Sequence, residues 1–263
     1  MIPPTDAIDV SGLRFRYHDG TEALRGLNLR VRQGESVCLA GPNGAGKSTL
    51  LLCLSGLLKG EGNVRVGNGV PVDAARRVPR PSLFGLVFQD PEDQLFCPTV
   101  GEDVAFGPRN GRLTEEAVAQ RVRESLAAVG LSGFDGRSAH HLSGGEKRRA
   151  AIAAVLACRP EILALDEPWA NLDARASLAV TDILRAFAGA KLVVSQDLYH
   201  AAEVCERLVI LDGGVVAADG PMKELLSDAT LLKEHGLEFG ARCAHCASGR
   251  GKGVQATFPS TGK

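Results

Sequence analysis

The sequence predicts an α/β protein in which a mostly parallel core sheet follows an N-terminal antiparallel β subdomain and is interrupted by a helical subdomain. Two observations support the core sheet and the helical part. Short apolar runs recur with helix-length segments between them, which is typical of buried parallel strands with crossover helices. Between Pro91 and His141 the strand pattern stops, so this stretch is expected to be helical.

The N-terminal residues predict a pair of antiparallel strands. Apolar and polar residues alternate over residues 8–15 and again over 27–31, with the period of a half-buried strand. The cluster His18–Thr21 lies between the two runs and contains Asp and Gly, which favour a turn. We therefore expect the two strands to pair directly.

Four short apolar runs, at residues 37–40, 86–88, 162–165 and 192–195, predict strands of the core sheet. The helical stretch has its own start signal, because two glutamates follow Thr114 and apolar residues then recur at helical spacing. The apolar positions expected to face the core are Val118, Val122, Leu126 and Val129.

Length and charge limit the partners of this chain. It has 263 residues, 44% of them hydrophobic, and 30 Lys and Arg against 31 Asp and Glu give a formal net charge of −1. This charge provides no global attraction to nucleic acid or to an anionic membrane, so no nucleic-acid partner is expected. The longest small-apolar run, residues 150–158, is much shorter than the ~20 residues of a spanning helix.

The ends of the chain predict neither export nor a packed C-terminus. Residues 1–6 lack the basic and apolar regions of a secretory signal, so a cytoplasmic location is expected. Five of the seven cysteines lie singly in apolar segments, which argues against a disulfide framework. We expect one domain over residues 1–239, with its helical subdomain at about 91–141, and a flexible tail over 240–263.

One glycine-rich loop has the composition of a phosphate-binding loop. Residues 41–49 read Gly-Pro-Asn-Gly-Ala-Gly-Lys-Ser-Thr and lie between a predicted strand and a helix. Backbone N–H groups of such a loop surround phosphates, Lys47 reaches the β- and γ-phosphates, and the Ser48 hydroxyl can bind Mg²⁺. An ordinary glycine turn is the alternative, which the strand–loop–helix context disfavours. The loop predicts a P-loop nucleoside triphosphatase.

Two adjacent carboxylates follow the predicted strand 162–165. Asp166 and Glu167 lie at the carboxyl end of this strand, where open α/β sheets bind ligands. Asp166 can hold Mg²⁺, and Glu167 can polarise the attacking water. An exposed turn before Pro168 is the alternative, and the phosphate loop upstream favours the functional interpretation.

A further anion-binding element is predicted at residues 142–146, which read Leu-Ser-Gly-Gly-Glu and precede a helix. Ser143 is a natural N-cap, and the two glycines leave the N–H groups of the helix terminus unobstructed. A plain capped helix is the alternative. It leaves unexplained why this helix directly precedes the carboxylate strand.

Together these motifs resemble the nucleotide-binding domains of ABC (ATP-binding cassette) ATPases, over roughly residues 8–225. By that resemblance residues 41–49 look like the Walker A loop, 162–167 like Walker B and 142–146 like the ABC signature, and the helical part looks like the ABC-specific subdomain. The resemblance implies an ATP hydrolase with ATP and Mg²⁺ as cofactors. The residues then expected to bind nucleotide are Tyr17, Gly41, Asn43, Gly44, Ala45, Gly46, Lys47, Ser48, Thr49, Gln89, Ser143, Gly144, Gly145, Glu146, Asp166 and Asp173.

Several roles come from the resemblance alone. Gln89 looks like the Q-loop glutamine that ligates Mg²⁺ together with Ser48 and Asp166, and Tyr17 matches the aromatic residue that stacks on adenine. Residues 171–173 look like the D-loop. The expected catalytic residues are Glu167 and Gln196.

Gln196 departs from the family pattern, which has a histidine at this position that contacts the γ-phosphate and the attacking water. A glutamine amide can donate hydrogen bonds but cannot become cationic. A slow-hydrolysing, ATP-binding regulatory module is therefore an alternative function.

The resemblance also implies a dimer in which ATP lies between the Walker A loop of one subunit and the signature of the other. With one cassette in the chain, a two-fold homodimer is the simplest arrangement, and a heterodimer with a second ABC ATPase is the alternative. A soluble ABC ATPase of DNA repair or translation would need a long coiled-coil insertion or tandem cassettes, which these 263 residues do not show.

The stretch Val87–Pro108 is similar to the ATPase subunits of energy-coupling-factor importers, which are the cobalt/nickel and vitamin systems. The resemblance implies that an integral membrane subunit docks near Gln89, Leu95 and Phe96, and that the chain is peripheral on the cytoplasmic face of the cell membrane. An ordinary loop is the alternative, but exposed Leu and Phe beside carboxylates would otherwise be a liability.

The tail gives one indication of the substrate. Cys243, His245 and Cys246, with His235 upstream, are ligands suited to Co, Ni or Zn, although a thiol pair without metal is the alternative. We therefore expect cobalt or nickel uptake, and vitamin uptake, such as biotin, is the second hypothesis.

Overall fold

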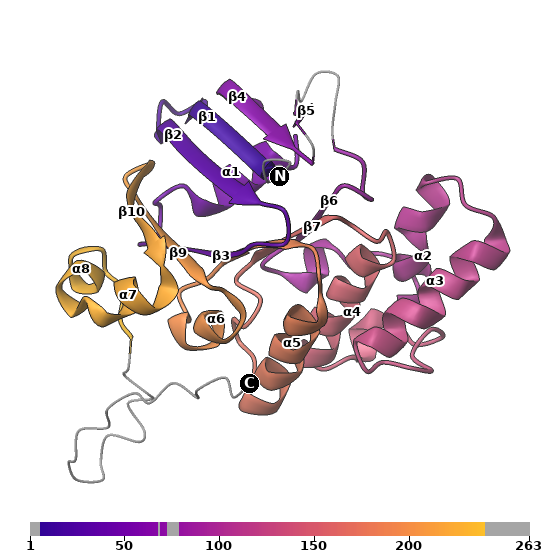
Figure 1. Cartoon of the computed structure of the whole chain (residues 1–263). Helices are drawn as coiled ribbons and strands as arrows, with labels where there is room; N and C mark the ends of the chain where they lie inside the picture. Colours follow the sequence, from indigo (N-terminus) through magenta and orange to yellow (C-terminus); the bar gives the residue numbers. More distant parts are fainter. Residues whose placement is uncertain (1–5, 68, 73–78, 240–263) are drawn as a thin grey trace, which may run out of the picture.

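Two β-sheets and a set of surrounding helices make up the computed structural model, which describes residues 6–67, 69–72 and 79–239 (Figure 1). The sheet at the top of Figure 1 is antiparallel, and the central sheet below it carries most helices. The α2–α3 region lies to one side of the central sheet, and α7 and α8 lie at the other. The predicted α/β fold with its parallel core sheet is confirmed.

The antiparallel sheet has the strand order β2-β1-β4-β5. Its long strands β1 (Asp6–Arg16) and β2 (Glu22–Arg32) pair with Val10 opposite Leu29, so the predicted antiparallel pair is confirmed. Strands β4 (Glu61–Val66) and β5 (Val70–Pro71) were not predicted, because β4 begins with Glu, Gly and Asn and has only two valines.

The central sheet has the order β10-β9-β3-β8-β7-β6. All neighbouring pairs from β9 to β6 are parallel, and only β10 at the edge is antiparallel. Strands β3 and β7 therefore flank β8, and their carboxyl ends lie together at one edge, where the loops after them build a site. The strand bounds are β3 Ser36–Ala40, β6 Phe84–Val87, β7 Ile162–Asp166, β8 Ala190–Val194, β9 Arg207–Asp212 and β10 Val215–Pro221.

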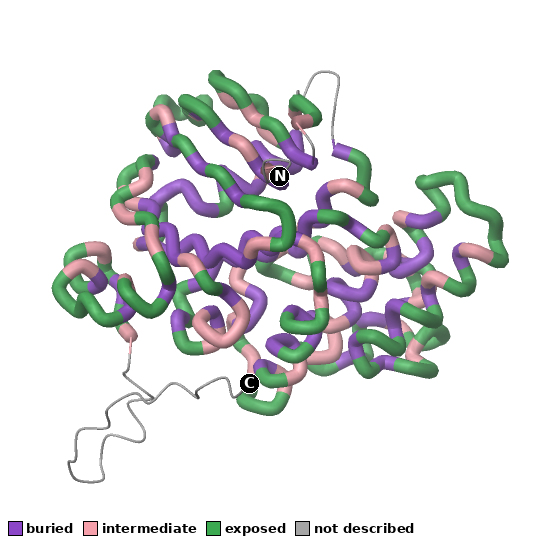
Figure 2. The backbone as a smooth tube through the Cα atoms, viewed as in Figure 1, coloured by how far each residue is buried: buried purple, intermediate pink, exposed green. Residues whose placement is uncertain are grey.

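Both faces of the central sheet are covered, which explains why its strands are continuous apolar runs. Every residue of β3, β7 and β8 is buried, as the purple tube in Figure 2 shows. Successive side chains of β3 enter different cores: Val37 and Leu39 face the antiparallel sheet and α1 (Lys47–Leu54), while Cys38 and Ala40 face the helices of the other side.

Most of the remaining helices begin at a residue whose side chain caps them. Thr114 is the N-cap of α3 (Glu115–Ala128), as predicted, and the four apolar residues expected to face the core are buried. Thr99 forms a capping box with Glu102 at the start of α2. The other helical bounds are α2 Val100–Asn110, α4 Gly144–Leu156, α5 Ala174–Ala186, α6 Leu198–Val204, α7 Met222–Ser227 and α8 Ala229–Glu234, with 3₁₀ turns at Pro91–Asp93 and Ala139–His141.

One sequence-based prediction about the surface is wrong. Leu95 was expected to be exposed beside Phe96, but it is only 8% exposed and belongs to the core, whereas Phe96 is 64% exposed. The 3₁₀ turn Pro91–Asp93 explains the difference, because the Leu95 N–H bonds to the Pro91 carbonyl and continues the turn into the protein. The tail residues Cys243, His245 and Cys246 lie outside the described residues.

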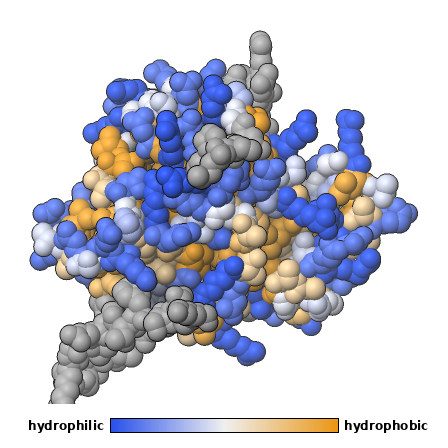
Figure 3. Space-filling view, viewed as in Figure 1, coloured by the Kyte–Doolittle hydropathy of each residue, from blue (hydrophilic) through white to orange (hydrophobic). Residues whose placement is uncertain are grey.

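Among the described residues, every helix is too short or too polar to cross a bilayer. On the face shown in Figure 3, hydrophilic residues cover most of the surface, and apolar residues form separate patches.

Candidate functional site

The glycine-rich loop lies between β3 and α1, as predicted. Gly41 has φ +143°, and a Cβ there would lie 1.9 Å from the Leu211 carbonyl oxygen of β9, so only glycine fits. Gly46 has φ +101°, and a Cβ there would lie 2.5 Å from the Ala23 carbonyl oxygen. The loop therefore packs directly on the backbone of two sheets, which fixes where its N–H groups point.

Lys47 is the first residue of α1 and is buried. Its Nζ donates to the carbonyl oxygens of Gly41 at 2.7 Å and Pro42 at 2.9 Å. Burial lowers the pKa of Lys47, and the nearby carboxylates of Glu167 and Asp166 oppose this shift. The ammonium is thus held inside the loop, next to the cavity into which the loop opens.

Asp166 ends β7, and Glu167 follows it at the carboxyl edge of the sheet. Burial raises the pKa of Asp166, while a hydrogen bond from Ser48 and the charges of Lys47 and Arg148 lower it. Burial is also the main cause of the raised pKa of Glu167, opposed by a backbone hydrogen bond from Gln196. Cations and hydroxyl donors around these two carboxylates compensate part of their desolvation.

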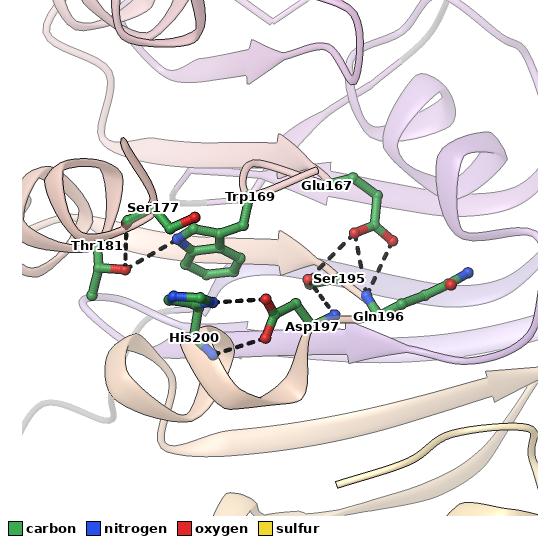
Figure 4. A network of polar contacts seen from close by, with 8 residues as sticks. All are labelled: Glu167, Trp169, Ser177, Thr181, Ser195, Gln196, Asp197 and His200. Carbon is green, nitrogen blue, oxygen red and sulfur yellow. Dashed lines mark hydrogen bonds and ion pairs between the residues drawn. The ribbon is translucent and has the colours of Figure 1, made fainter. Parts of the chain in front are cut away.

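Glu167 has φ +47°, a left-handed conformation that residues with a Cβ rarely adopt. Its backbone N–H donates to the Val194 carbonyl of β8, and its carboxylate accepts from the Gln196 N–H at 3.1 and 3.2 Å and from the Ser195 hydroxyl at 3.3 Å. Figure 4 shows the carboxylate directed at this turn after β8. The loop after β8 therefore fixes the direction of the Glu167 side chain.

The Gln196 side chain points away from the Glu167 carboxylate (Figure 4). Its Nε2 donates to Oδ1 of Asn43 in the glycine-rich loop at 2.6 Å, a contact between residues 153 positions apart. Gln196 thus joins the two loops through its side chain and supports Glu167 through its backbone.

Sequence reasoning missed a group of packed residues beside Glu167. Trp169 is buried, donates from Nε1 to the Thr181 hydroxyl of α5 at 3.1 Å, and stacks on the His200 ring. His200 Nδ1 lies 2.7 Å from Oδ2 of Asp197 (Figure 4). His200 therefore packs against Trp169 and Asp197, next to the turn that carries Gln196, and it does not line the cavity beside the phosphate loop. Trp169, which directly follows Glu167 and Pro168, was the feature of the sequence that could have indicated this group of packed residues.

One cavity of about 580 Å³ collects most of the predicted nucleotide residues. The Tyr17 hydroxyl bonds the Thr49 hydroxyl at 2.9 Å on its wall, and Tyr17 is 40% exposed, so its ring is accessible to a base. Gly41 does not line this cavity and instead supports the loop from beneath. The predicted residues around the cavity are Tyr17, Asn43, Gly44, Ala45, Gly46, Lys47, Ser48, Thr49, Gln89, Asp166, Glu167 and Gln196.

The predicted signature and D-loop residues do not reach this cavity. Ser143 caps α4 and accepts from the Glu146 N–H, while the Glu146 carboxylate accepts from the Ser143 N–H at 2.8 Å, so the capping box is complete. These bonds lower the pKa of Glu146. Asp173 accepts from the Ala176 N–H at 2.7 Å and caps α5. Ser143, Gly144 and Asp173 are exposed, and Gly145 and Glu146 are partly exposed.

Three residues with oxygen donors suited to Mg²⁺ line the same two cavities. A second cavity of about 760 Å³ lies beside the first, and both are lined by Ser48, Gln89 and Asp166. A hydroxyl, an amide carbonyl and a carboxylate are hard oxygen ligands, as Mg²⁺ prefers. Within the described part of the chain, no three His, Cys, Asp or Glu side chains cluster as a metal site.

Comparison with known proteins decides the family. The profile of the family described as ABC transporter matches residues 24–170, more than half of the chain. The chain belongs to the ABC transporter family. Members of this family are ATPases, so this ABC ATPase binds and hydrolyses ATP.

Known proteins match the ABC ATPase in sequence and in structure over more than four fifths of its length. The energy-coupling factor transporter ATP-binding protein EcfA of Methanothermobacter thermautotrophicus is 45% identical over 237 residues, which are 88% of this chain and 76% of the relative. The solved structure of CbiO1 from Clostridium perfringens, part of the ABC transporter complex CbiONQ, has a TM-score of 0.75 and 33% identity, covering 88% of this chain and 94% of CbiO1. The ATP-binding cassette MJ0796, a dimer in a post-hydrolysis state with ADP and phosphate, has a TM-score of 0.73 and 28% identity, covering 82% of this chain and 98% of that cassette.

Replacing Gln196 with histidine should raise the turnover of the ABC ATPase by roughly tenfold with little change in ATP affinity. A cationic imidazole can stabilise charge that develops on the γ-phosphate, and a charge-assisted hydrogen bond contributes about 1.5–3 kcal/mol against about 1 kcal/mol for a neutral one. Phosphate release and ATP binding should be measured for both proteins. Gln196→Asn, which keeps the amide but shortens its reach, is the control and should show no gain. An unchanged or lower rate in Gln196→His would show that the glutamine is already competent.

Proposed function

We propose that this ABC ATPase powers an energy-coupling-factor type importer of transition-metal ions, with cobalt or nickel as the cargo. The observation that carries the ATPase part is the single cavity in which the phosphate loop, the carboxylate pair and Gln196 meet. The importer class is supported by the similarity to EcfA and CbiO1 and by the stretch Val87–Pro108. Uptake of a vitamin such as biotin is the alternative.

In the proposed mechanism, Lys47 and the loop N–H groups bind the phosphates, and Tyr17 stacks on the adenine. Ser48, Gln89 and Asp166 would hold Mg²⁺, which neutralises phosphate charge when bound. Glu167 would accept a hydrogen bond from the attacking water, and the Ser195–Gln196 turn holds its carboxylate at the wall of the nucleotide cavity.

The exposed end of α4 supports a dimer with composite sites. Ser143 and its neighbours Gly144 and Gly145 lie outside the nucleotide cavity of their own chain, and the helix terminus offers N–H groups to an anion. The MJ0796 cassette is dimeric. We propose a two-fold homodimer in which this end, with Glu146 and Asp173, faces the ATP of the second copy.

The membrane subunit is proposed to dock on Phe96 and Phe106. These rings are 64% and 49% exposed, and they contact each other edge to face with centroids 5.0 Å apart. They follow the Q-loop residue Gln89 in the sequence, within the stretch Val87–Pro108 that resembles the importer ATPases. The ATPase would then be peripheral on the cytoplasmic face of the cell membrane.

Phe96→Asp combined with Phe106→Asp should weaken binding to the membrane subunits at least about tenfold, because buried aromatic anchors of interfaces typically contribute about 2 kcal/mol or more. Co-purification and transport should fall while ATP affinity stays unchanged. Val215→Asp is the control, since Val215 is 42% exposed but lies on β10, at the sheet edge opposite β6. A complex that survives the double substitution would place the docking site elsewhere.

The cargo is tested with the whole transporter. The ATPase should be co-purified with its membrane partners, which mass spectrometry identifies, and the complex reconstituted in vesicles. ATP-dependent accumulation of Co²⁺ or Ni²⁺, absent with Glu167→Gln, is expected. Accumulation of biotin or another vitamin without metal uptake would overturn the metal assignment and leave the importer class standing.

A further inference from the structure

We propose that Trp169 and His200 are positioning residues that hold the turn Ser195–Asp197 in place and, through this turn, the Glu167 carboxylate. This inference deepens the proposed function, because it rests on the role proposed there for Glu167. Trp169 and His200 are not among the residues that line the nucleotide cavity, so they would act on turnover without touching ATP.

The rings of Trp169 and His200 lie against each other (Figure 4). Their centroids are 5.8 Å apart and their planes differ by 21°, so the two rings are stacked. The Tyr199 ring meets the imidazole edge to face, with the centroids 5.3 Å apart. Trp169 is buried and His200 is partly buried. Contacts with two aromatic rings therefore restrict the orientation of the imidazole.

His200 contacts both oxygens of the Asp197 carboxylate. Its Nδ1 lies 2.7 Å from Oδ2, and its backbone N–H donates to Oδ1 at 3.1 Å, which makes Asp197 the N-cap of α6. The Asp197 backbone N–H donates to the Ser195 hydroxyl at 3.0 Å, and that hydroxyl donates to Oε2 of Glu167 at 3.3 Å. An unbroken series of contacts thus leads from the imidazole to the Glu167 carboxylate.

Trp169 supports the other end of this series. Its Nε1 donates to the Thr181 hydroxyl at 3.1 Å, and that hydroxyl donates to the Ser177 carbonyl of α5 at 2.9 Å. Thr181 and Ser177 are buried, so bulk water does not compete for these hydrogen bonds. Because Trp169 follows Glu167 by only two residues, the contacts close into a ring that begins and ends at Glu167.

A closed ring of contacts matters for Glu167 for two reasons. Its backbone has φ +47°, a conformation that persists only where the surroundings fix it. Gln196, whose backbone N–H donates to the carboxylate, has no positive charge with which to attract it. Packing of the turn on Trp169 then provides the orientation. The expected effect on rate is large, because misplacing a catalytic group by about 1 Å typically costs about a hundredfold.

The experiment measures ATP turnover and ATP affinity of the full-length chain with Trp169→Leu, with His200→Ala and with both. Each single change should lower the maximal turnover about tenfold and leave the ATP affinity within about twofold, because the phosphate contacts are untouched. The double variant should be little slower than either single variant, since both changes open the same ring of contacts. His200→Asn, whose amide can occupy the place of Nδ1, should recover part of the turnover.

Combination with Glu167→Gln separates positioning from a loss of stability. In this background, measured in single-turnover reactions, Trp169→Leu and His200→Ala should each change the residual rate by less than about twofold, because the carboxylate that they position is absent. Both changes should still lower the thermal midpoint, since the packing is lost in either background.

Leu126→Ala is the control for destabilisation. Leu126 is buried on α3 in the helical subdomain, and its truncation should lower the thermal midpoint while turnover stays within about twofold of the wild type. Trp169→Phe keeps an aromatic ring but lacks the Nε1 donor. It should fold even where Trp169→Leu does not, and it should show an intermediate turnover.

Additive effects of Trp169→Leu and His200→Ala on turnover would overturn the inference. Equal losses in the wild-type and Glu167→Gln backgrounds would do the same, as would a loss of ATP affinity in place of turnover. Wild-type turnover in Glu167→Gln itself would overturn the role proposed for Glu167, and this inference with it.

Discussion

Glu167→Gln should lower ATP turnover by at least about a hundredfold while ATP remains bound, because positioned acid–base groups typically contribute factors of about 10²–10⁴. The amide has the size of the carboxylate, and its oxygen can still accept the bonds from the Gln196 N–H and the Ser195 hydroxyl. It cannot take up a proton from the attacking water. Slow turnover with intact phosphate contacts should make an ATP-bound dimer accumulate, which sedimentation or size-exclusion chromatography measures.

Glu161→Gln is the matched control for this result. Glu161 is exposed and immediately precedes β7, the strand whose other end carries Glu167. The change removes the same charge next to the other end of β7 and should leave turnover within about twofold of the wild type. Wild-type turnover in Glu167→Gln would refute the assigned role and point to another base.

Lys47→Ala should weaken ATP binding by about ten- to a hundredfold. The ammonium lies within 2.9 Å of two loop carbonyls and would reach the β- and γ-phosphates, and hydrogen bonds to charged groups contribute about 1.5–3 kcal/mol. The substitution also leaves the Gly41 and Pro42 carbonyls without their donor. Equilibrium binding of ATP in the presence of Mg²⁺ measures the effect directly, so it does not depend on the transporter.

Lys191 provides a stringent control, because it is a second buried lysine with a similar environment. Its Nζ donates to the Phe187 carbonyl at 2.6 Å, and burial lowers its pKa, as it does for Lys47. It lies at the opposite end of β8 from the site. Lys191→Ala should lower the thermal midpoint but not the affinity for ATP. Equal losses of affinity in both variants would mean that Lys47 supports the fold and not the nucleotide.

The sequence predicted those features that depend on neighbouring residues. The phosphate loop was recognisable because its glycines and its Lys-Ser pair act within nine positions, and β3, β7 and β8 were recognisable because strands covered on both faces need unbroken apolar runs. The Thr114 cap was readable for the same reason, since a cap and its helix are adjacent.

Features that depend on distant contacts were not predictable in this way. Three such contacts join different loops or helices. They are the hydrogen bond between Gln196 and Asn43, the stacking of Trp169 on His200, and the hydrogen bonds from Arg148 to the carbonyls of Phe88 and Gln89. Leu95 was assigned to the wrong environment because hydrophobicity alone does not tell which of two neighbouring apolar residues turns inward. The turn at Pro91–Asp93 decides this, and it buries Leu95 while leaving Phe96 exposed.

The left-handed backbone of Glu167 has a consequence for how this chain can evolve. A non-glycine residue in such a conformation typically costs about 1–3 kcal/mol. Glycine would relieve that backbone cost, but it would also remove the carboxylate that accepts from the Gln196 N–H and the Ser195 hydroxyl. If Glu167 acts as proposed, position 167 is a site where a gain in thermal stability would be accompanied by a loss of ATP turnover.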